Sequence, residues 1–263
     1  MGNITNLMAS PKERLNRATE KRQQILRFLR QEIWSSQDIL GMVMGIRSRT
    51  TTHKNLVRLE AEGVLKKHTI TGLGGGTVAL WGITSHGQAM SFDPATEEPI
   101  SAYFEPGKVA EVTVKHALDL QRLRVIAESA GWHGWINGDR LSNLLKGGKR
   151  PDAIVISPDG TKTAIEIERT IKTTKRYEQI LASYLMSLKA GEVHQVVWLA
   201  PTTEIALRLQ AIVFSIRTVT IQKQRFPIDP DKHHARLFFK DYSRWPGDLQ
   251  GNSPARQHGY PTI

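Results

Sequence analysis

The sequence predicts an α+β protein with two folded parts: a small helical domain that ends in a hairpin, and a larger α/β domain around a mixed sheet. The first part rests on three helical patterns and two alternating apolar segments within residues 11–92. The second rests on short apolar strands that alternate with helical patterns within residues 107–225. The 263 residues suffice for one large domain or two smaller ones.

Composition restricts the possible partners and chemistries. The chain has 36 Lys and Arg against 25 Asp and Glu, a net charge of +11, and no cysteine. Cysteine nucleophiles, thiolate metal sites and disulfides are therefore excluded. No apolar run reaches the ~20 residues needed to cross a bilayer. We expect a bacterial cytoplasmic protein without membrane insertion, whose basic charge favours double-stranded DNA as partner.

The first domain is predicted segment by segment. Helical spacing is expected in three segments and strand alternation in two: 14–30, 36–42, 48–62, 64–70 and 78–81. Ser36 and Ser48 are expected to cap the second and third helices, and Thr84 a short closing helix. This order predicts a winged helix-turn-helix over residues 11–92, with a hairpin turn at 72–76.

A recognition helix normally presents its N-terminal end to DNA, and here that end is polar and basic. The hairpin would place further positive charge beside a phosphate backbone. The candidate DNA contacts are Arg47, Arg49, Thr50, Thr52, His53, Lys54, Lys66 and Lys67. Winged helices also serve as protein-interaction modules, in which such charges are simply solvated.

A polar, proline-bearing linker is expected at 93–106, and the second domain at 107–225. Its predicted elements are a helix, three strands, a helix, a strand, a helix and a final strand, at 111–130, 132–136, 153–156, 163–168, 170–190, 193–199, 203–214 and 218–222. Apolar periodicity thins after 225, so residues 226–263 are expected to form a partly disordered extension.

Three carboxylates are expected to meet in the second domain. Strand side chains alternate, so Glu166 and Glu168 share one face, and Asp152 begins the antiparallel neighbour. Three such charges repel one another unless a cation neutralises them. Oxygen ligands favour Mg²⁺ or Mn²⁺, so Asp152, Glu166 and Glu168 are predicted metal ligands and catalytic residues.

The segments Pro151-Asp152 and Glu166-x-Glu168 resemble the PD-(D/E)xK nuclease superfamily, which implies a restriction-endonuclease-like αβββαβ domain. Glu168 departs from that pattern, because it stands where the family has lysine. Lys172, or less favourably Lys175, is expected to supply the cation from the start of the following helix.

A narrower resemblance covers roughly residues 15–215. PDAIVI followed by AIEIERTIKTTKRYEQILASYL is similar to the replication-relaxation family, and the size and layout to MobC-type plasmid relaxases. It implies recognition of an origin of transfer, metal-dependent nicking of one strand, and partners such as a coupling protein and an accessory mobilisation protein. Lys172 and Tyr177 match family-pattern positions.

Two further site candidates and two other functions stay open. His116 lies in the helix before the sheet, a helix that in such nucleases sometimes contributes to the site; Tyr177 shares a helix face with Tyr184, and both favour packing. The other functions are a nuclease of the same fold in transposition, repair or defence, and a non-catalytic DNA-binding regulator or replication accessory protein.

Overall fold

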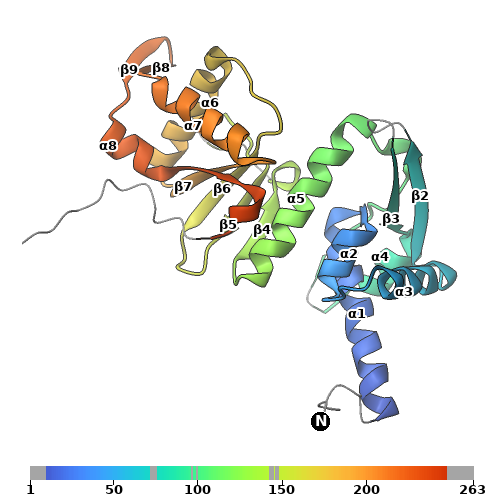
Figure 1. Ribbon diagram of the computed structural model, residues 1–263. Coiled ribbons are helices and arrows are strands. Elements are labelled where there is room, and N and C mark those ends of the chain that lie inside the picture. The colour runs from blue at the N-terminus through green and yellow to red at the C-terminus, as the bar shows by residue number, and fades with distance from the viewer. Residues whose placement is uncertain are drawn as a thin grey trace, which may run out of the picture. The chain divides into compact units, whose positions relative to one another are not determined.

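The computed structural model of the 263-residue chain describes residues 10–71, 76–95, 97–98, 100–141, 145 and 148–247. They form an α+β protein that divides into two compact units, Met1–Val125 and Ile126–Ile263 (Figure 1). The expected turn at 72–76 and the expected disorder at the C-terminal end fall largely on residues outside this description.

The N-terminal unit combines helices with a three-stranded antiparallel sheet of order β1-β3-β2. Its elements in chain order are α1 (Pro11–Glu32), β1 (Trp34–Ser36), α2 (Gln37–Val43), α3 (Arg49–Ala61), β2 (Leu65–Thr71), β3 (Thr77–Ile83), α4 (Ser85–Ser91) and the 3-10 turn η1 (Pro106–Lys108). The predicted caps are confirmed: the hydroxyls of Ser36, Ser48 and Thr84 each accept a hydrogen bond from the first turn of their helix.

An apolar core holds these helices on the sheet. Leu29, Ile39, Leu56 and Trp81 are each completely buried in it. Gly41 lets α2 and α3 approach closely, because a Cβ atom there would lie 3.0 Å from Oγ1 of Thr52. The loop from α2 to α3 is thereby fixed by packing.

The segment expected to be a linker is partly anchored to the N-terminal unit. Phe104 is 3% exposed, and its amide donates to the carbonyl of Ile83 at 2.8 Å. Its ring covers Gly82 of β3, where a Cβ atom would lie 2.0 Å from Cγ of Phe104. The division between the units falls later in the chain, within α5 (Glu111–Ser129), and Leu118 and Val125 of α5 pack in the N-terminal core.

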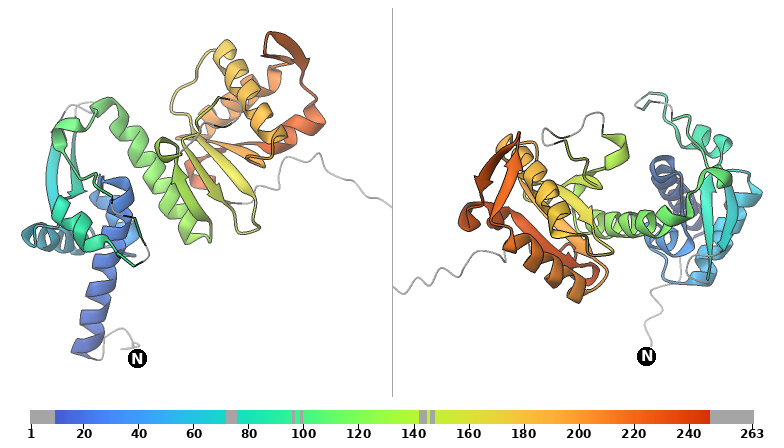
Figure 2. Two further views of the ribbon diagram at one scale, coloured as in Figure 1. Left: turned by 180° about the vertical axis from the view of Figure 1, so that it is seen from behind. Right: turned by 90° about the horizontal axis from the view of Figure 1, so that it is seen from above.

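The C-terminal unit is built on a five-stranded mixed sheet of order β10-β7-β6-β5-β4 (Figures 1 and 2). Its strands are β4 (His133–Asn137), β5 (Ala153–Ile156), β6 (Lys162–Ile167), β7 (Gln195–Ala200) and β10 (Leu237–Asp241). The strands β4, β5 and β6 are antiparallel neighbours, whereas β6, β7 and β10 run parallel. The other elements are η2 (Gly138–Arg140), α6 (Thr174–Lys189), α7 (Thr203–Ser215), β8 (Thr218–Ile221), β9 (Gln224–Pro227), α8 (Pro230–His233), η3 (His234–Arg236) and η4 (Tyr242–Arg244).

Two expectations for the end of the chain differ from the structure. The strand expected at 218–222 forms β8, which among the described residues pairs with β9 in a hairpin separate from the main sheet. The expected extension from residue 226 instead provides β10, an edge strand of the main sheet whose Leu237 is completely buried. Five residues give too short an alternation to reveal such a strand, because its stability comes from its parallel partner β7.

Candidate functional site

The three predicted carboxylates lie on the face of the C-terminal sheet that α6 covers. Asp152 comes immediately before β5, and its backbone amide bonds to the carbonyl of Ile165 on β6 at 3.0 Å. Its Oδ2 accepts from the amide of Ile167 at 2.7 Å. Asp152 is therefore fixed at the end of β6, next to the two glutamates, as the antiparallel pairing predicted.

Glu166 is a buried carboxylate, 6% exposed, with two direct partners. Its Oε1 accepts a hydrogen bond from the hydroxyl of Tyr184 and lies 2.8 Å from Nζ of Lys149. Burial, followed by the negative charge of Asp152, raises the pKa of Glu166 to about 7, against the opposing effects of Lys149 and Tyr184. Glu166 therefore keeps its proton to a higher pH than an ordinary glutamate does.

Glu168 follows β6 directly and is 4% exposed. Nζ of Lys172 lies 2.8 Å and 2.6 Å from its two carboxylate oxygens. Lys172 precedes α6, which begins at Thr174 because the Thr173 hydroxyl caps it; the lysine therefore reaches Glu168 from the loop and not from the first helical turn. Lys172 therefore forms an ion pair with both carboxylate oxygens of Glu168.

Two tyrosines of α6 lie beside the glutamates. Tyr177 and Tyr184 are seven residues apart, about two helical turns, so both point at the sheet. Tyr184 donates a hydrogen bond to Glu166, and Tyr177 interacts electrostatically with Glu168. Burial raises the pKa of the Tyr177 phenol to about 12, and its oxygen accepts from the amide of Lys172 at 3.0 Å. With 1% of its surface exposed, Tyr177 is a packing and positioning residue rather than an accessible nucleophile.

One more tyrosine adjoins the carboxylates from the end of β10. Tyr242 interacts electrostatically with Asp152 and with the guanidinium of Arg169. Burial raises its pKa to about 12, which Arg169 opposes and Asp152 reinforces. Residues from beyond the expected domain boundary at 225 therefore contribute to this site.

The charges of the site are compensated by lysine ammonium groups. Two lysines, Lys149 and Lys172, each pair with one glutamate. Within the part of the chain that the structure describes, no three Asp, Glu or His side chains converge as a ready-made metal site. The donor type still fits a hard cation, because Asp152 and Glu166 are close enough for the charge of one to raise the pKa of the other. The metal site stays a prediction.

The candidate DNA contacts in the N-terminal unit are, with one exception, exposed. Those with exposed side chains are Arg47, Arg49, Thr50, His53, Lys54, Lys66 and Lys67. Thr52 is the exception: it is 2% exposed, and its hydroxyl donates to the carbonyl of Ser48 at 3.1 Å. The expectation for Thr52 is wrong, because the helical spacing that exposes its neighbours turns Thr52 towards Gly41 on α2.

Two of these basic side chains are oriented by aromatic and amide groups. Nζ of Lys67 lies 5.5 Å from the ring centre of Trp81. Nδ1 of His53 lies 3.2 Å from Oε1 of Gln37 on α2. His116, the remaining candidate, is half-buried on the part of α5 that belongs to the N-terminal unit, whereas the carboxylates belong to the C-terminal unit.

Sequence reasoning missed Lys149, Arg169, Tyr184 and Tyr242 as members of the site. Lys149 stands two residues before Pro151, so its proximity to the motif was a usable signal. Tyr184 had a signal in its seven-residue spacing from Tyr177. No local pattern connects Tyr242 with β6, because the parallel addition of β10 brings it there.

No helix in the described residues has both the length and the apolar character that a membrane span requires. Comparisons of the chain with protein-family models, with curated proteins and with solved structures give no match.

Proposed function

We propose that the N-terminal unit is a winged helix that binds double-stranded DNA. The succession of α1, β1, α2, α3 and the hairpin β2-β3 fits that fold. Exposed basic side chains cluster on the first two turns of α3, namely those of Arg49, His53 and Lys54. The hairpin adds Lys66 and Lys67, both exposed. Such a distribution suits base contacts from the helix and phosphate contacts from the hairpin.

The C-terminal unit is, in this proposal, a nuclease-like domain of the PD-(D/E)xK type. The order β4, β5, β6, α6, β7 of this unit, preceded along the chain by α5, agrees with the αβββαβ arrangement of that superfamily. Asp152 and Glu166 take the positions of the two motif acids, and Lys172 takes over the role of the motif lysine from outside the motif. The single observation that carries this proposal is the contact of Lys172 Nζ with both oxygens of Glu168.

The function that follows is metal-dependent nicking of one DNA strand. Mg²⁺ or Mn²⁺, when bound, would lower the pKa of a water molecule and neutralise charge on the phosphate. Asp152 and Glu166 supply oxygen ligands, and the raised pKa of Glu166 lets it release a proton near neutral pH when a cation arrives. Lys172 and Lys149 hold positive charge at the same place, where the scissile phosphate would gain negative charge.

The similarity to MobC-type relaxases makes the origin of transfer of a mobilisable plasmid the proposed target. Hand-over of the nicked strand to a coupling protein, with an accessory mobilisation protein, belongs to the same proposal. The buried phenol of Tyr177 does not suit it as the covalent nucleophile in the described conformation. Water-dependent hydrolysis is therefore the proposed chemistry.

The test is relaxation of supercoiled plasmid DNA that carries the origin of transfer. We expect open-circular product with Mg²⁺ or Mn²⁺, none with EDTA, and none from Asp152→Ala, while DNA binding by Asp152→Ala survives. Asp159→Ala is the matched control, because Asp159 is an exposed carboxylate of the same unit on the β5-β6 turn. Full activity of Asp152→Ala would contradict the assignment.

A second candidate is a DNA-binding regulator or replication accessory protein without catalysis. It is favoured by one observation: Glu166 and Glu168 each form an ion pair with a lysine, and Glu166 also accepts a hydrogen bond from Tyr184. In that case the carboxylates would only stabilise the fold. Calorimetric titration with Mn²⁺ distinguishes the two candidate functions. A nuclease must bind Mn²⁺, and Asp152→Ala should abolish that binding. A non-catalytic regulator does not require Mn²⁺ binding.

A further inference from the structure

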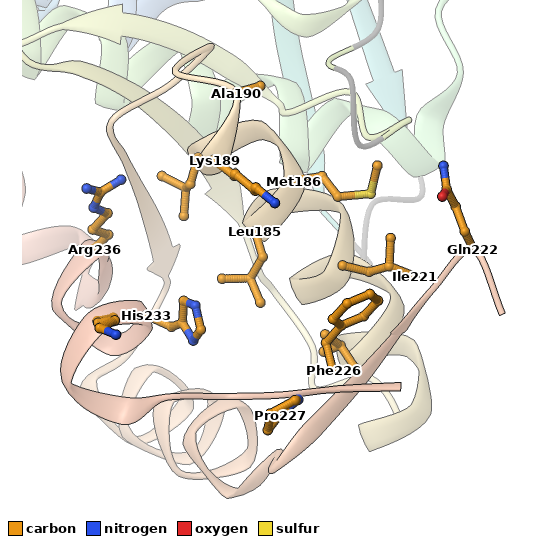
Figure 3. A pocket seen from close by; sticks show the side chains of 13 residues that line it. Leu185, Met186, Lys189, Ala190, Ile221, Gln222, Phe226, Pro227, His233 and Arg236 are labelled. Atoms are coloured by element: carbon orange, nitrogen blue, oxygen red, sulfur yellow. The ribbon is translucent and has the colours of Figure 1, made fainter. Parts of the chain in front are cut away.

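The C-terminal unit contains a groove of about 960 Å³ between the second half of α6, the hairpin β8-β9 and the segment that includes α8 (Figure 3). Its floor is apolar, formed by Leu185 and Met186 of α6 and by Ile221 and Phe226 of the hairpin. Phe226 keeps 42% of its surface exposed. Exposed apolar surfaces of this kind mark sites where another molecule binds.

The margin of the groove is positively charged. Lys189, Lys232 and Arg236 line it together with His233, and no Asp or Glu is among the lining residues. Lys232 pairs with the partly exposed Asp229 at 3.4 Å. Considering only the residues described, neither Lys189 nor Arg236 forms an ion pair. The groove therefore combines an apolar floor with uncompensated positive charge.

We propose that this groove binds an acidic amphipathic helix of a partner protein. The apolar side chains of such a helix, spaced three and four residues apart, would cover Phe226 and Leu185, and its flanking carboxylates would meet Lys189 and Arg236. The proposal does not depend on nuclease activity.

Charge argues against the two occupants that this chain could provide. A second copy carries the same net charge of +11, so two copies repel each other over long range. The segment 248–263 contains one acidic residue, Asp248, and one basic residue, Arg256, so it offers no net negative charge to the rim. An acidic partner is the complementary choice.

The test is fluorescence anisotropy with the full-length protein and a labelled designed helix of about 14 residues, about four turns, with leucines on one face and glutamates beside them. Matched peptides have the same composition in scrambled order, or lysine in place of glutamate. We expect micromolar binding of the designed helix only. Phe226→Asp, and separately the pair Lys189→Glu and Arg236→Glu, should weaken it at least about tenfold. Arg208→Glu, on the exposed face of α7, should not weaken it.

Several results would overturn the proposal. These are no binding of the designed helix, equal binding of the scrambled or basic peptide, or unchanged binding in folded groove variants with unaltered circular dichroism and thermal unfolding. A dimer in sedimentation that Phe226→Asp dissociates would assign the groove to a second copy instead. Tighter peptide binding after removal of 248–263 would assign it to that segment. Plasmid nicking in the groove variants should equal that of the unmodified protein, which keeps this test separate from that of the proposed function.

Discussion

The buried carboxylate of Glu166 makes the stability of the C-terminal unit depend on pH, and Glu166→Gln should remove much of that dependence. In the folded protein, burial and the charge of Asp152 raise its pKa from 4.5 to about 7. Between these two pH values, the folded state keeps a proton that the unfolded chain has released. The free energy of unfolding therefore falls as the pH rises through this window. The stabilising contribution of Glu166 is present in full only below about pH 4.5.

The magnitude follows from the size of the window. A pKa that is raised from 4.5 to about 7 corresponds to about 3 kcal/mol at ~1.4 kcal/mol for each pH unit. The glutamine variant cannot ionise, so the free energy of unfolding of the unmodified protein should fall relative to that of Glu166→Gln by up to about 3 kcal/mol between pH 4.5 and pH 8. The difference between the two proteins cancels the contributions of titrating groups that do not interact with Glu166.

Urea unfolding in EDTA, followed by the fluorescence of buried tryptophans such as Trp198, provides the measurement. Glu178→Gln is the matched control, because Glu178 is an exposed glutamate on α6. It should leave the pH dependence unchanged. Equal pH dependence of the unmodified protein and Glu166→Gln would refute the reasoning, because the pKa of Glu166 in the folded protein would then be that of an ordinary glutamate.

Three further perturbations test the other parts of the molecule. Lys172→Ala should lower the nicking rate at saturating DNA at least about tenfold, about 1.4 kcal/mol in the barrier, with little change in affinity. Replacing Lys54 by alanine should weaken binding to all DNA sequences and reduce the salt slope by about one, whereas Arg49→Ala should cost about 1–3 kcal/mol at a single base pair. Gly82→Ala should destabilise the N-terminal unit by about 1–3 kcal/mol in thermal unfolding, because the new Cβ atom overlaps the ring of Phe104.

Each of these has a matched control and a contrary result. Lys175→Ala, on the exposed first turn of α6, should nick at the normal rate, and normal nicking by Lys172→Ala would reduce Lys172 to a phosphate contact. Unchanged binding by Arg49→Ala and the Lys54 variant together would move recognition away from α3. Gly107→Ala should be neutral because a Cβ atom there meets no atom within 4 Å, and an equal loss in both glycine variants would discredit the packing argument.

Much of the site was predictable because it depends on local strand alternation. Glu166 and Glu168 lie on the same face of the sheet because they are two residues apart, and the antiparallel turn returns Asp152 to their end. Capping residues such as Ser48 mark helix starts with equal certainty, since their hydroxyls bond to amides only three positions away.

The remaining features depend on long-range contacts that leave no local pattern. Thr52 looked like its exposed neighbours, and only the packing of α2 against α3 decides that it points inward. Tyr242 reaches the carboxylates through a parallel strand from the far end of the chain. Phe104 lies in a polar segment that resembles a linker. Its ring nevertheless packs directly on the backbone of Gly82, because glycine has no side chain there.

The parallel pairing of β10 with β7 also determines where the chain can be truncated without exposing a hydrophobic strand edge. Four consecutive residues of β7, from Val196 to Leu199, are buried, and β10 covers their backbone edge. A chain that stopped at residue 225, where the sequence alone would place the end of the domain, would leave those amides and carbonyls open on a hydrophobic strand. Such an edge recruits strands from other molecules. A truncated domain would therefore tend to aggregate. A domain that extends past Asp241 keeps β10, which pairs with the edge of β7 and prevents other strands from adding there.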